Sequence, residues 1–180
     1  DHFVLNGSKT YISNGINGGA FVVAARTVPD KPHGIGLFVV EETMDGFSRG
    51  RNLAKMGLKA QDTAELFFEN VRVPAENVLG DPQRGFYSLM RFLAEERLIS
   101  ACQAVAHGQI AFDLTMDYIL EREAFGKPIA AFQNSRFKMA EMRTALDVTQ
   151  TFIDQCVMMH IKGELSADLA AEAKYYATEV

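Results

Sequence analysis

The chain has 180 residues, of which 48% are hydrophobic and 23% are charged, and its formal net charge is −5. This composition is typical of a globular chain with its own core, and it excludes disorder, collagen and a coiled-coil rod. The negative charge argues against non-specific nucleic-acid binding, which depends on Lys and Arg neutralising phosphates.

Turn-forming residues are concentrated in the first half of the chain. Residues 1–85 hold eleven of the fourteen Gly and four of the five Pro. This shift predicts an antiparallel β-domain over residues 1–82 and an incomplete helical bundle over residues 83–180. The expected fold class is α+β, in which a β-barrel-like or sandwich domain precedes an antiparallel helical bundle.

In the first part, short runs of β-branched and aromatic residues alternate with turn signals. The predicted strands cover residues 3–5, 9–13, 20–25, 35–40, 66–68 and 71–73. Asn6-Gly7 predicts a type I′ hairpin turn between the first two strands. Val71 and Val73 are out of phase with Leu66 and Phe68, so we expect a bulge or bend at Glu69-Asn70.

After Gly85 the apolar spacing becomes helical. It predicts helices over residues 86–123, 132–162 and 166 onward, with Gly163 ending the second and Ser166 capping the third. The first helix is apolar on nearly all sides, and its charge-free stretch is shorter than the roughly 20 residues of a membrane span, so we expect a buried core helix. No stop signal precedes Val180, so we expect an excerpt of a longer protein.

Common cofactor-loop and metal-binding motifs do not occur in the sequence. GxGxxG and GxxxxGK[ST] are both missing, and no two His are spaced i,i+4, so we expect no metal site. Cys102 and Cys156 lie in apolar helical surroundings. We therefore expect two buried free thiols rather than a disulfide bridge, and a reducing compartment.

Three local features suggest chemistry. Tyr11 and Ser13 place an aromatic ring and a hydroxyl on one strand face before a turn, which suits a flat ring ligand but equally suits an ordinary strand end. The Glu95-Glu96-Arg97 run lies inside the most apolar helix. It is either a surface charge cluster or ion pair, or the location of a desolvated carboxylate base.

The third feature is a helix junction. Arg122 and Phe125-Gly126 end the first long helix, and Gln133 begins the second. A phosphate or an adenine ring could be held there, although the same residues also serve as an ordinary helix cap.

Several motifs together resemble the acyl-CoA dehydrogenase family, in its order and spacing and over essentially the whole chain. They are KTYISNG from Lys9, MGLKAQDTAEL from Met56, FENVRVP from Phe68, NVLG from Asn77, REAFGKPI from Arg122 and Phe132-Gln133. The resemblance implies the middle β-domain and part of the C-terminal helical domain of a longer subunit, most similar to the long-chain branch.

The resemblance also implies an activity. The expected enzyme is an FAD-dependent oxidoreductase of fatty-acid or branched-chain β-oxidation, which converts an acyl-CoA thioester into a trans-2-enoyl-CoA. Expected partners are an electron-transferring flavoprotein and further copies of the same chain, typically a tetramer built as two dimers. Expected locations are the bacterial cytoplasm or the mitochondrial matrix; secretion, nucleic acid and a transmembrane segment are not expected.

The family's site residues map onto this chain by motif. Tyr11, Ile12 and Ser13 match the strand beside the flavin ring, although many relatives have Trp and Thr in place of Tyr11 and Ser13. The matches to the FAD pyrophosphate and adenine site, reached from a neighbouring subunit, are Arg122, Phe125 and Gln133. The matches to the acyl-CoA pocket are Tyr87, Ala94, Glu95 and Arg97.

Glu96 is the predicted catalytic base. Most branches of the family carry the base on a loop nearer the C-terminus, whereas the long-chain and isovaleryl branches carry it immediately before this Arg. The alternatives are an acyl-CoA oxidase or another flavoprotein of the superfamily, or a non-catalytic fragment whose base lies outside the chain.

Overall fold

The computed structural model describes all of residues 1–180 and divides them into two compact units, Asp1–Leu89 and Met90–Val180. The first unit is built from strands, and α1 begins at its end. Its elements are β1 (His2–Ser13), β2 (Ala20–Arg26), β3 (Ile35–Glu41), β4 (Phe47–Arg49), β5 (Thr63–Pro74) and the 3₁₀ turn η1 (Ala75–Asn77). The rest of the chain forms α1 (Gly85–Glu121), β6 (Glu123–Ala124), β7 (Lys127–Pro128), the 3₁₀ turn η2 (Ile129–Ala131), α2 (Gln133–Ile161) and α3 (Ala167–Ala177).

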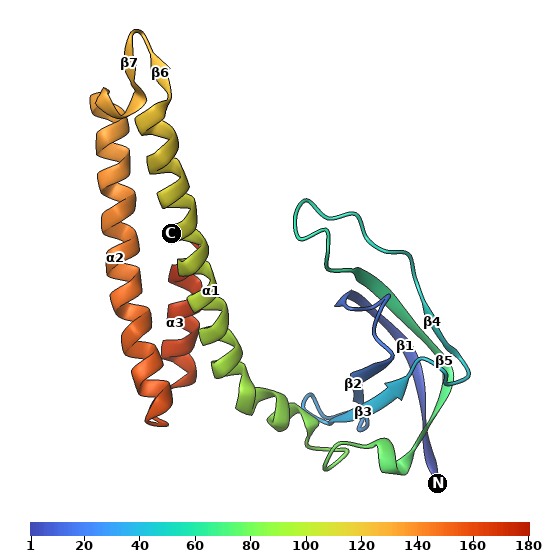
Figure 1. The fold of residues 1–180 in the computed structure, drawn as a ribbon. Helices are drawn as coiled ribbons and strands as arrows, with labels where there is room; N and C mark the ends of the chain where they lie inside the picture. Colours follow the sequence, from blue (N-terminus) through green and yellow to red (C-terminus); the bar gives the residue numbers. More distant parts are fainter. The chain divides into compact units, whose positions relative to one another are not determined.

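The β unit contains two antiparallel sheets (Figure 1). One has the strand order β1-β5-β4, and the other consists of β2 and β3. A single bridge between Phe38 and Val78 links β3 to the segment that follows β5. An antiparallel β-domain followed by antiparallel helices is the fold class that the sequence predicts, and the prediction is confirmed.

The Asn6-Gly7 hairpin prediction is wrong. β1 runs through both residues without a turn, because each half of this strand pairs with β5. The Asn6 side chain instead joins β5, where its Oδ1 accepts a hydrogen bond from the Asn70 backbone N–H at 2.8 Å. Long-range pairing thus overrides the local turn signal.

The bend predicted at Glu69-Asn70 is confirmed. The pairing shifts from Leu5↔Val71 to Gly7↔Phe68, so Glu69 and Asn70 together oppose one residue of β1, and Asn70 has a φ of 54°. This is a β-bulge, and the extra residue reverses the alternation of side chains along β5. Leu66 and Phe68 before it and Val71 and Val73 after it are consequently all buried.

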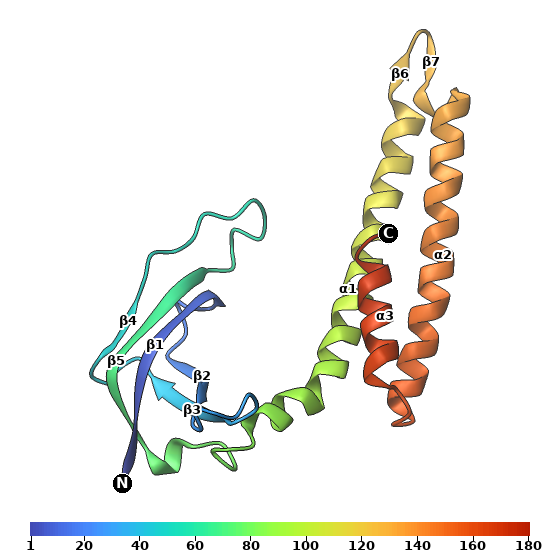
Figure 2. The same ribbon diagram turned by 180° about the vertical axis from the view of Figure 1, so that it is seen from behind.

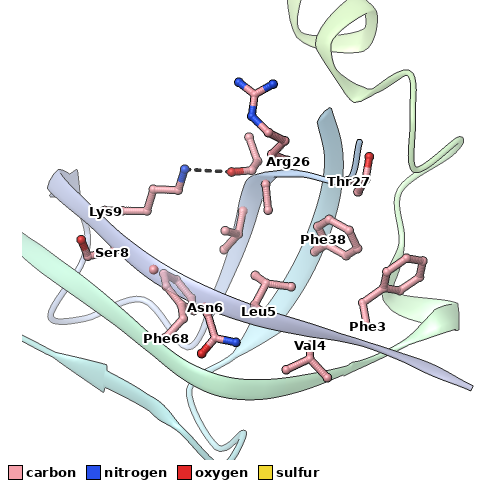
Figure 3. Close-up of a pocket in the computed structure, with 14 residues that line it drawn as sticks. Phe3, Val4, Leu5, Asn6, Ser8, Lys9, Arg26, Thr27, Phe38 and Phe68 are labelled. Atoms are coloured by element: carbon pink, nitrogen blue, oxygen red, sulfur yellow. Dashed lines mark hydrogen bonds between the residues drawn. The ribbon is translucent and has the colours of Figure 1, made fainter. Parts of the chain in front are cut away.

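A hollow of about 510 Å³ lies between β1 and β2, whose edges pair with no other strand there (Figure 3). Phe3, Leu5, Phe38 and Phe68 line its apolar side. Lys9 spans it, because its Nζ donates a hydrogen bond to the Ala24 carbonyl oxygen at 2.8 Å.

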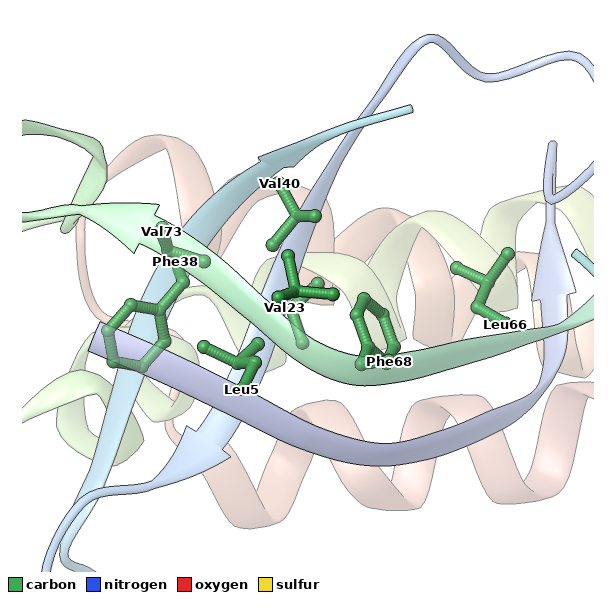
Figure 4. Close-up of a cluster of buried hydrophobic side chains, with 8 residues drawn as sticks. Leu5, Val23, Phe38, Val40, Leu66, Phe68 and Val73 are labelled. Carbon is green, nitrogen blue, oxygen red and sulfur yellow. The ribbon is translucent and has the colours of Figure 1, made fainter. Parts of the chain in front are cut away.

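The core of the β unit lies between the two sheets (Figure 4). Its buried members are Leu5, Val23, Phe38, Val40, Leu66, Phe68, Val71 and Val73. Phe38 is 1% exposed and stacks edge-on against Phe3, with ring centroids 5.1 Å apart. Burying each such side chain stabilises the fold by about 1.5–3 kcal/mol, so this cluster is the main source of stability in the unit.

In the helical unit, α1 and α2 run side by side and the short β6–β7 hairpin connects them (Figure 2). The predicted helix ends agree with the observed ones to within two residues where local signals mark them. Ser166 caps α3, since its Oγ accepts a hydrogen bond from the Leu169 N–H at 3.1 Å. Gly163, with a φ of 73°, follows the end of α2.

A single stripe of α1 is buried in this unit. Leu98, Ala101 and Val105 pack against Ile153 and Cys156 of α2 and Ala173 and Ala177 of α3. The expectation that α1 is buried on nearly all sides is wrong for this chain: its other faces expose Ile99, Ile110, Leu114, Tyr118 and Leu120. The two helices α2 and α3 cover only one side of α1.

Both cysteines are free, as predicted. Cys156 is buried and Cys102 is half-buried in the helical core, and this burial raises the pKa of each thiol. No helix combines the length and apolar composition that a bilayer span requires.

Gly46 provides a test of the β1–β5–β4 sheet. It has a φ of 86°, and a β-carbon there would overlap the Glu69 carbonyl oxygen. Gly46→Ala should therefore lower the free energy of unfolding by about 2–4 kcal/mol. The matched control is Gly57→Ala, because a β-carbon at Gly57 meets no atom within 4 Å. The control should change stability by less than about 1 kcal/mol in urea titrations. Equal effects of the two substitutions would contradict the close approach of Gly46 to the Glu69 carbonyl oxygen.

Candidate functional site

Tyr11, Ile12 and Ser13 form the end of β1. The pairing shifts between Lys9↔Leu66 and Ile12↔Ala64, so a second bulge lies at Thr10 and Tyr11. Tyr11 has a φ of 56° and is 76% exposed. A left-handed backbone at a non-Gly residue costs about 1–2 kcal/mol, so the rest of the structure must hold it in place.

Around this bulge, neighbouring side chains of β1 lie on opposite faces of the strand. Ile12 is half-buried and packs against the β core, whereas Tyr11 and Ser13 are exposed. The Ser13 hydroxyl forms no hydrogen bond within the chain, and neither does the Tyr11 phenol. A second hollow of about 490 Å³ is lined by Ile12, Ser13 and Asn14 together with residues of β2.

The turn after Ser13 is tied to Asp62, which directly precedes β5. The Asp62 carboxylate accepts hydrogen bonds from the Ile16 backbone N–H at 2.6 Å and from Asn17 Nδ2 at 2.9 Å. Its carbonyl oxygen accepts a third from the Asn14 N–H at 3.2 Å. Gly15 is buried inside this turn, where a β-carbon would lie 2.9 Å from the Ile12 carbonyl oxygen.

Asp62 is only 6% exposed. The hydrogen bond from the Ile16 N–H is the main cause that lowers the pKa of the Asp62 carboxyl below 3.8. Hydrogen bonds from the side chain and backbone of Asn17 lower this pKa further, whereas burial raises it. No Lys or Arg forms an ion pair with it. Hydrogen-bond donors rather than a counter-charge therefore hold this buried carboxylate in its ionised form.

On α1, the predicted substrate and base residues divide between two sides. Ala94 and Arg97 are half-buried, on the side of the helix that leads into the buried stripe, whereas Glu95 and Glu96 are exposed. Neither glutamate forms an ion pair with Arg97.

Glu96 lies three to four residues from Phe92 and Ile99, which are 55% and 59% exposed. This spacing puts the three side chains on one face of the helix. The carboxylate therefore stands among apolar side chains that no part of this chain covers.

Tyr87 lies near the start of α1, in the first unit. It is 54% exposed, and its ring lies beneath the Arg84 guanidinium at 5.7 Å. Tyr87 therefore offers an exposed aromatic edge beside a cation, and together with Arg84 it lines a hollow that also includes His33.

The three residues predicted around the helix junction lie close together in the chain and are all exposed. Phe125 and Gly126 form the β6–β7 turn with φ values of 54° and 76°, and Phe125 is 97% exposed. The Arg122 carbonyl accepts a hydrogen bond from the Ile129 N–H at 2.8 Å, which closes the hairpin at its base. Gln133 is the first residue of α2, where free backbone N–H groups favour an anion.

Comparison with known proteins identifies the family. Residues 1–71 match the acyl-CoA dehydrogenase middle domain, and residues 83–180 match the acyl-CoA dehydrogenase C-terminal domain. The chain belongs to the acyl-CoA dehydrogenase family. The sequence-based prediction of the family is thus confirmed.

Individual relatives agree with this assignment. The mitochondrial long-chain specific acyl-CoA dehydrogenase of Sus scrofa is 46% identical over 99% of the chain and 42% of its own length. A solved acyl-CoA dehydrogenase from Geobacillus kaustophilus is 44% identical, with a TM-score of 0.96 over 99% of the chain and 48% of its own. The prolyl acyl carrier protein oxidase AnaB is 26% identical, with a TM-score of 0.91 and coverage of 99% and 48%. The chain thus spans less than half the length of these relatives.

The exposed end of β1 fits a flavin. Tyr11 offers an aromatic face, Ser13 offers a hydroxyl without a partner, and both are held outward from the core. An aromatic face that can stack and a hydroxyl that can form a hydrogen bond suit a flat ring with polar edges. Asp62, which shapes the turn beside them, was not singled out as a site residue from the sequence. Its only local signal is a carboxylate placed directly before a buried strand.

The Asp62 carboxylate should titrate with a midpoint below 3.8, the value of an unperturbed Asp. A folded-state pKa that is depressed stabilises the native chain above the unfolded pKa, and this contribution is lost as the pH falls through the folded value. Carboxyl and amide NMR shifts between pH 7 and pH 2 measure it, with the Ile16 amide as the reporter. Asp62→Asn should abolish the shift of that amide, and a midpoint at or above 3.8 would contradict the geometry.

Proposed function

We propose that this chain is part of an FAD-dependent acyl-CoA dehydrogenase that oxidises the Cα–Cβ bond of an acyl-CoA thioester to a trans-2-enoyl-CoA. The observation that supports this most strongly is the 46% identity to a long-chain specific acyl-CoA dehydrogenase across 99% of the chain. The exposed positions of Tyr11, Ser13 and Glu96 are compatible with it, since a cofactor and a substrate must reach these side chains.

In the proposed reaction, Glu96 removes the α-proton of the thioester. The Cβ–H bond breaks as the Cα=Cβ bond forms, and its two electrons leave with the β-hydrogen. Bound FAD supplies the acceptor for this hydride at its N5 position. A carboxylate in water is too weak a base for an α-proton, so the site must exclude water around it. The apolar neighbours Phe92 and Ile99 suit that requirement once substrate covers them.

The remaining residues bind and orient. Tyr11, Ile12 and Ser13 would lie beside the flavin ring, with the Ser13 hydroxyl as a hydrogen-bond donor. The FAD pyrophosphate and adenine of a neighbouring subunit would be held by Arg122, Phe125 and Gln133. Parts of the acyl-CoA pocket would be formed by Tyr87, Ala94, Glu95 and Arg97.

The helix-junction assignment implies a homo-oligomer, for which we propose a tetramer built as two dimers. Phe125 is 97% exposed and is held outward by a left-handed backbone, which suits a residue that contacts another chain.

The proposed electron acceptor is an electron-transferring flavoprotein. The proposed location is a mitochondrial matrix or a bacterial cytoplasm, and the proposed substrate branch is long-chain, with isovaleryl as the alternative.

The purified complete protein should be yellow, and anaerobic addition of a long-chain acyl-CoA should bleach the visible flavin absorption, because two electrons pass from substrate to flavin. Titration with acyl-CoAs of increasing length then measures the chain-length preference. A colourless protein, or a flavin that no acyl-CoA bleaches, would refute the proposed activity.

Glu96→Gln should lower kcat by about 10²–10⁴-fold and abolish exchange of the substrate α-proton, with FAD still bound. The matched control is Glu95→Gln, whose side chain is turned by about 100° around the helix. This control should affect KM more than kcat. If the Glu96→Gln enzyme retained turnover, the base would have to lie elsewhere.

An acyl-thioester oxidase is the second candidate, because the chain also matches a solved acyl carrier protein oxidase with a TM-score of 0.91. Such an enzyme would share the proton abstraction and pass the two electrons to O₂, with release of H₂O₂. Rapid reoxidation of the reduced protein by air, with stoichiometric peroxide, would favour the oxidase over the dehydrogenase.

A further inference from the structure

Asp62 is a buried ionised group to which the proposed reaction assigns no role. We propose that Asp62 is a positioning residue, which fixes the end of β1 so that Tyr11 and Ser13 present a preformed surface to the flavin. This inference rests on the proposed function for the presence of FAD. The hydrogen bonds of Asp62 from which it is argued do not depend on that function.

Three hydrogen bonds connect Asp62 to the turn that follows Ser13. The two carboxylate oxygens accept from the Ile16 N–H and from Asn17 Nδ2, at 2.6 and 2.9 Å. The carbonyl oxygen accepts from the Asn14 N–H, one step beyond the Ser13↔Thr63 pair. The pairing of β1 with β5 is therefore extended by a side chain at the point where the ladder ends.

The strand end needs this anchor because its backbone is strained on both sides. Tyr11 and Asn14 have φ values of 56° and 58°, so Ile12 and Ser13 lie between two left-handed residues. Such a conformation persists only where surrounding contacts over-determine it. Ile12 is anchored by packing against the core, whereas the exposed Ser13 is held by its pairing with Thr63 and by the turn that follows it.

A carboxylate suits this task better than an amide. Both donors, a backbone N–H and an amide NH₂, require acceptors, and Asp supplies two oxygens. Asn at the same position would present one NH₂ group to a donor and lose one of the two bonds. Asp62→Asn is therefore a nearly isosteric change that removes a single interaction and one charge.

The test measures FAD binding to the complete protein in four forms: wild type, Asp62→Asn, Asn17→Ala and Asp45→Asn. Asp45→Asn is the control for the lost charge, because Asp45 is exposed in the turn before β4 and its side chain makes no hydrogen bond. Circular dichroism and thermal melting establish that each form is folded. The readouts are the FAD dissociation constant and the shape of the visible absorption band of bound flavin, neither of which requires turnover.

We expect Asp62→Asn to weaken FAD binding by about tenfold, which corresponds to about 1.4 kcal/mol, and to alter the flavin band. Asn17→Ala, which leaves the Ile16 bond intact, should give a smaller change in the same direction and serves as the main test if Asp62→Asn does not fold. Asp45→Asn should match the wild type.

Two results would overturn the inference, and they are distinguishable. If the wild type binds FAD and the folded Asp62→Asn and Asn17→Ala proteins bind it equally well with an unchanged flavin band, Asp62 is only a structural residue and the proposed function is unaffected. If the wild type binds no FAD, the proposed function fails and the inference fails with it.

Discussion

The antiparallel pairing of β1 with β5 is the constraint on which the β unit depends. Two bulges interrupt it, at Glu69-Asn70 and at Thr10-Tyr11. The first keeps both halves of β5 facing one core, and the second turns Tyr11 outward while Ile12 stays packed against that core. One ladder therefore sets both the stability of the unit and the presentation of its exposed aromatic and hydroxyl side chains.

The helical unit also separates buried from exposed side chains, and it does so by the packing of its helices. Small side chains such as Ala101, Cys156 and Ala173 allow close packing of one stripe of α1 against α2 and α3. The opposite face keeps Glu96 together with large exposed apolar side chains. The proposed dehydrogenation requires another molecule or chain segment to cover this face and exclude water from it.

The features that could be predicted from sequence have local causes. The bulge at Glu69-Asn70 follows from the phase change between Phe68 and Val71, and the start of α3 follows from the Ser166 cap. The hairpin at Asn6-Gly7 was predicted wrongly because β5 offers both halves of β1 more hydrogen bonds than a turn would. Asp62 was overlooked because its partners, Ile16 and Asn17, lie about 45 residues earlier in the chain.

The sequence by itself determined the division into a β part and a helical part, the family and the types of side chain available for chemistry. These follow from turn residues, hydrophobic periods and motifs, which act over a few residues. Only the tertiary structure decided that α1 is covered on one side, that Tyr11 and Ser13 face outward, and that a buried carboxylate anchors the strand end beside them. Burial and hydrogen-bond partners depend on residues distant in the chain, so only the folded arrangement specifies them.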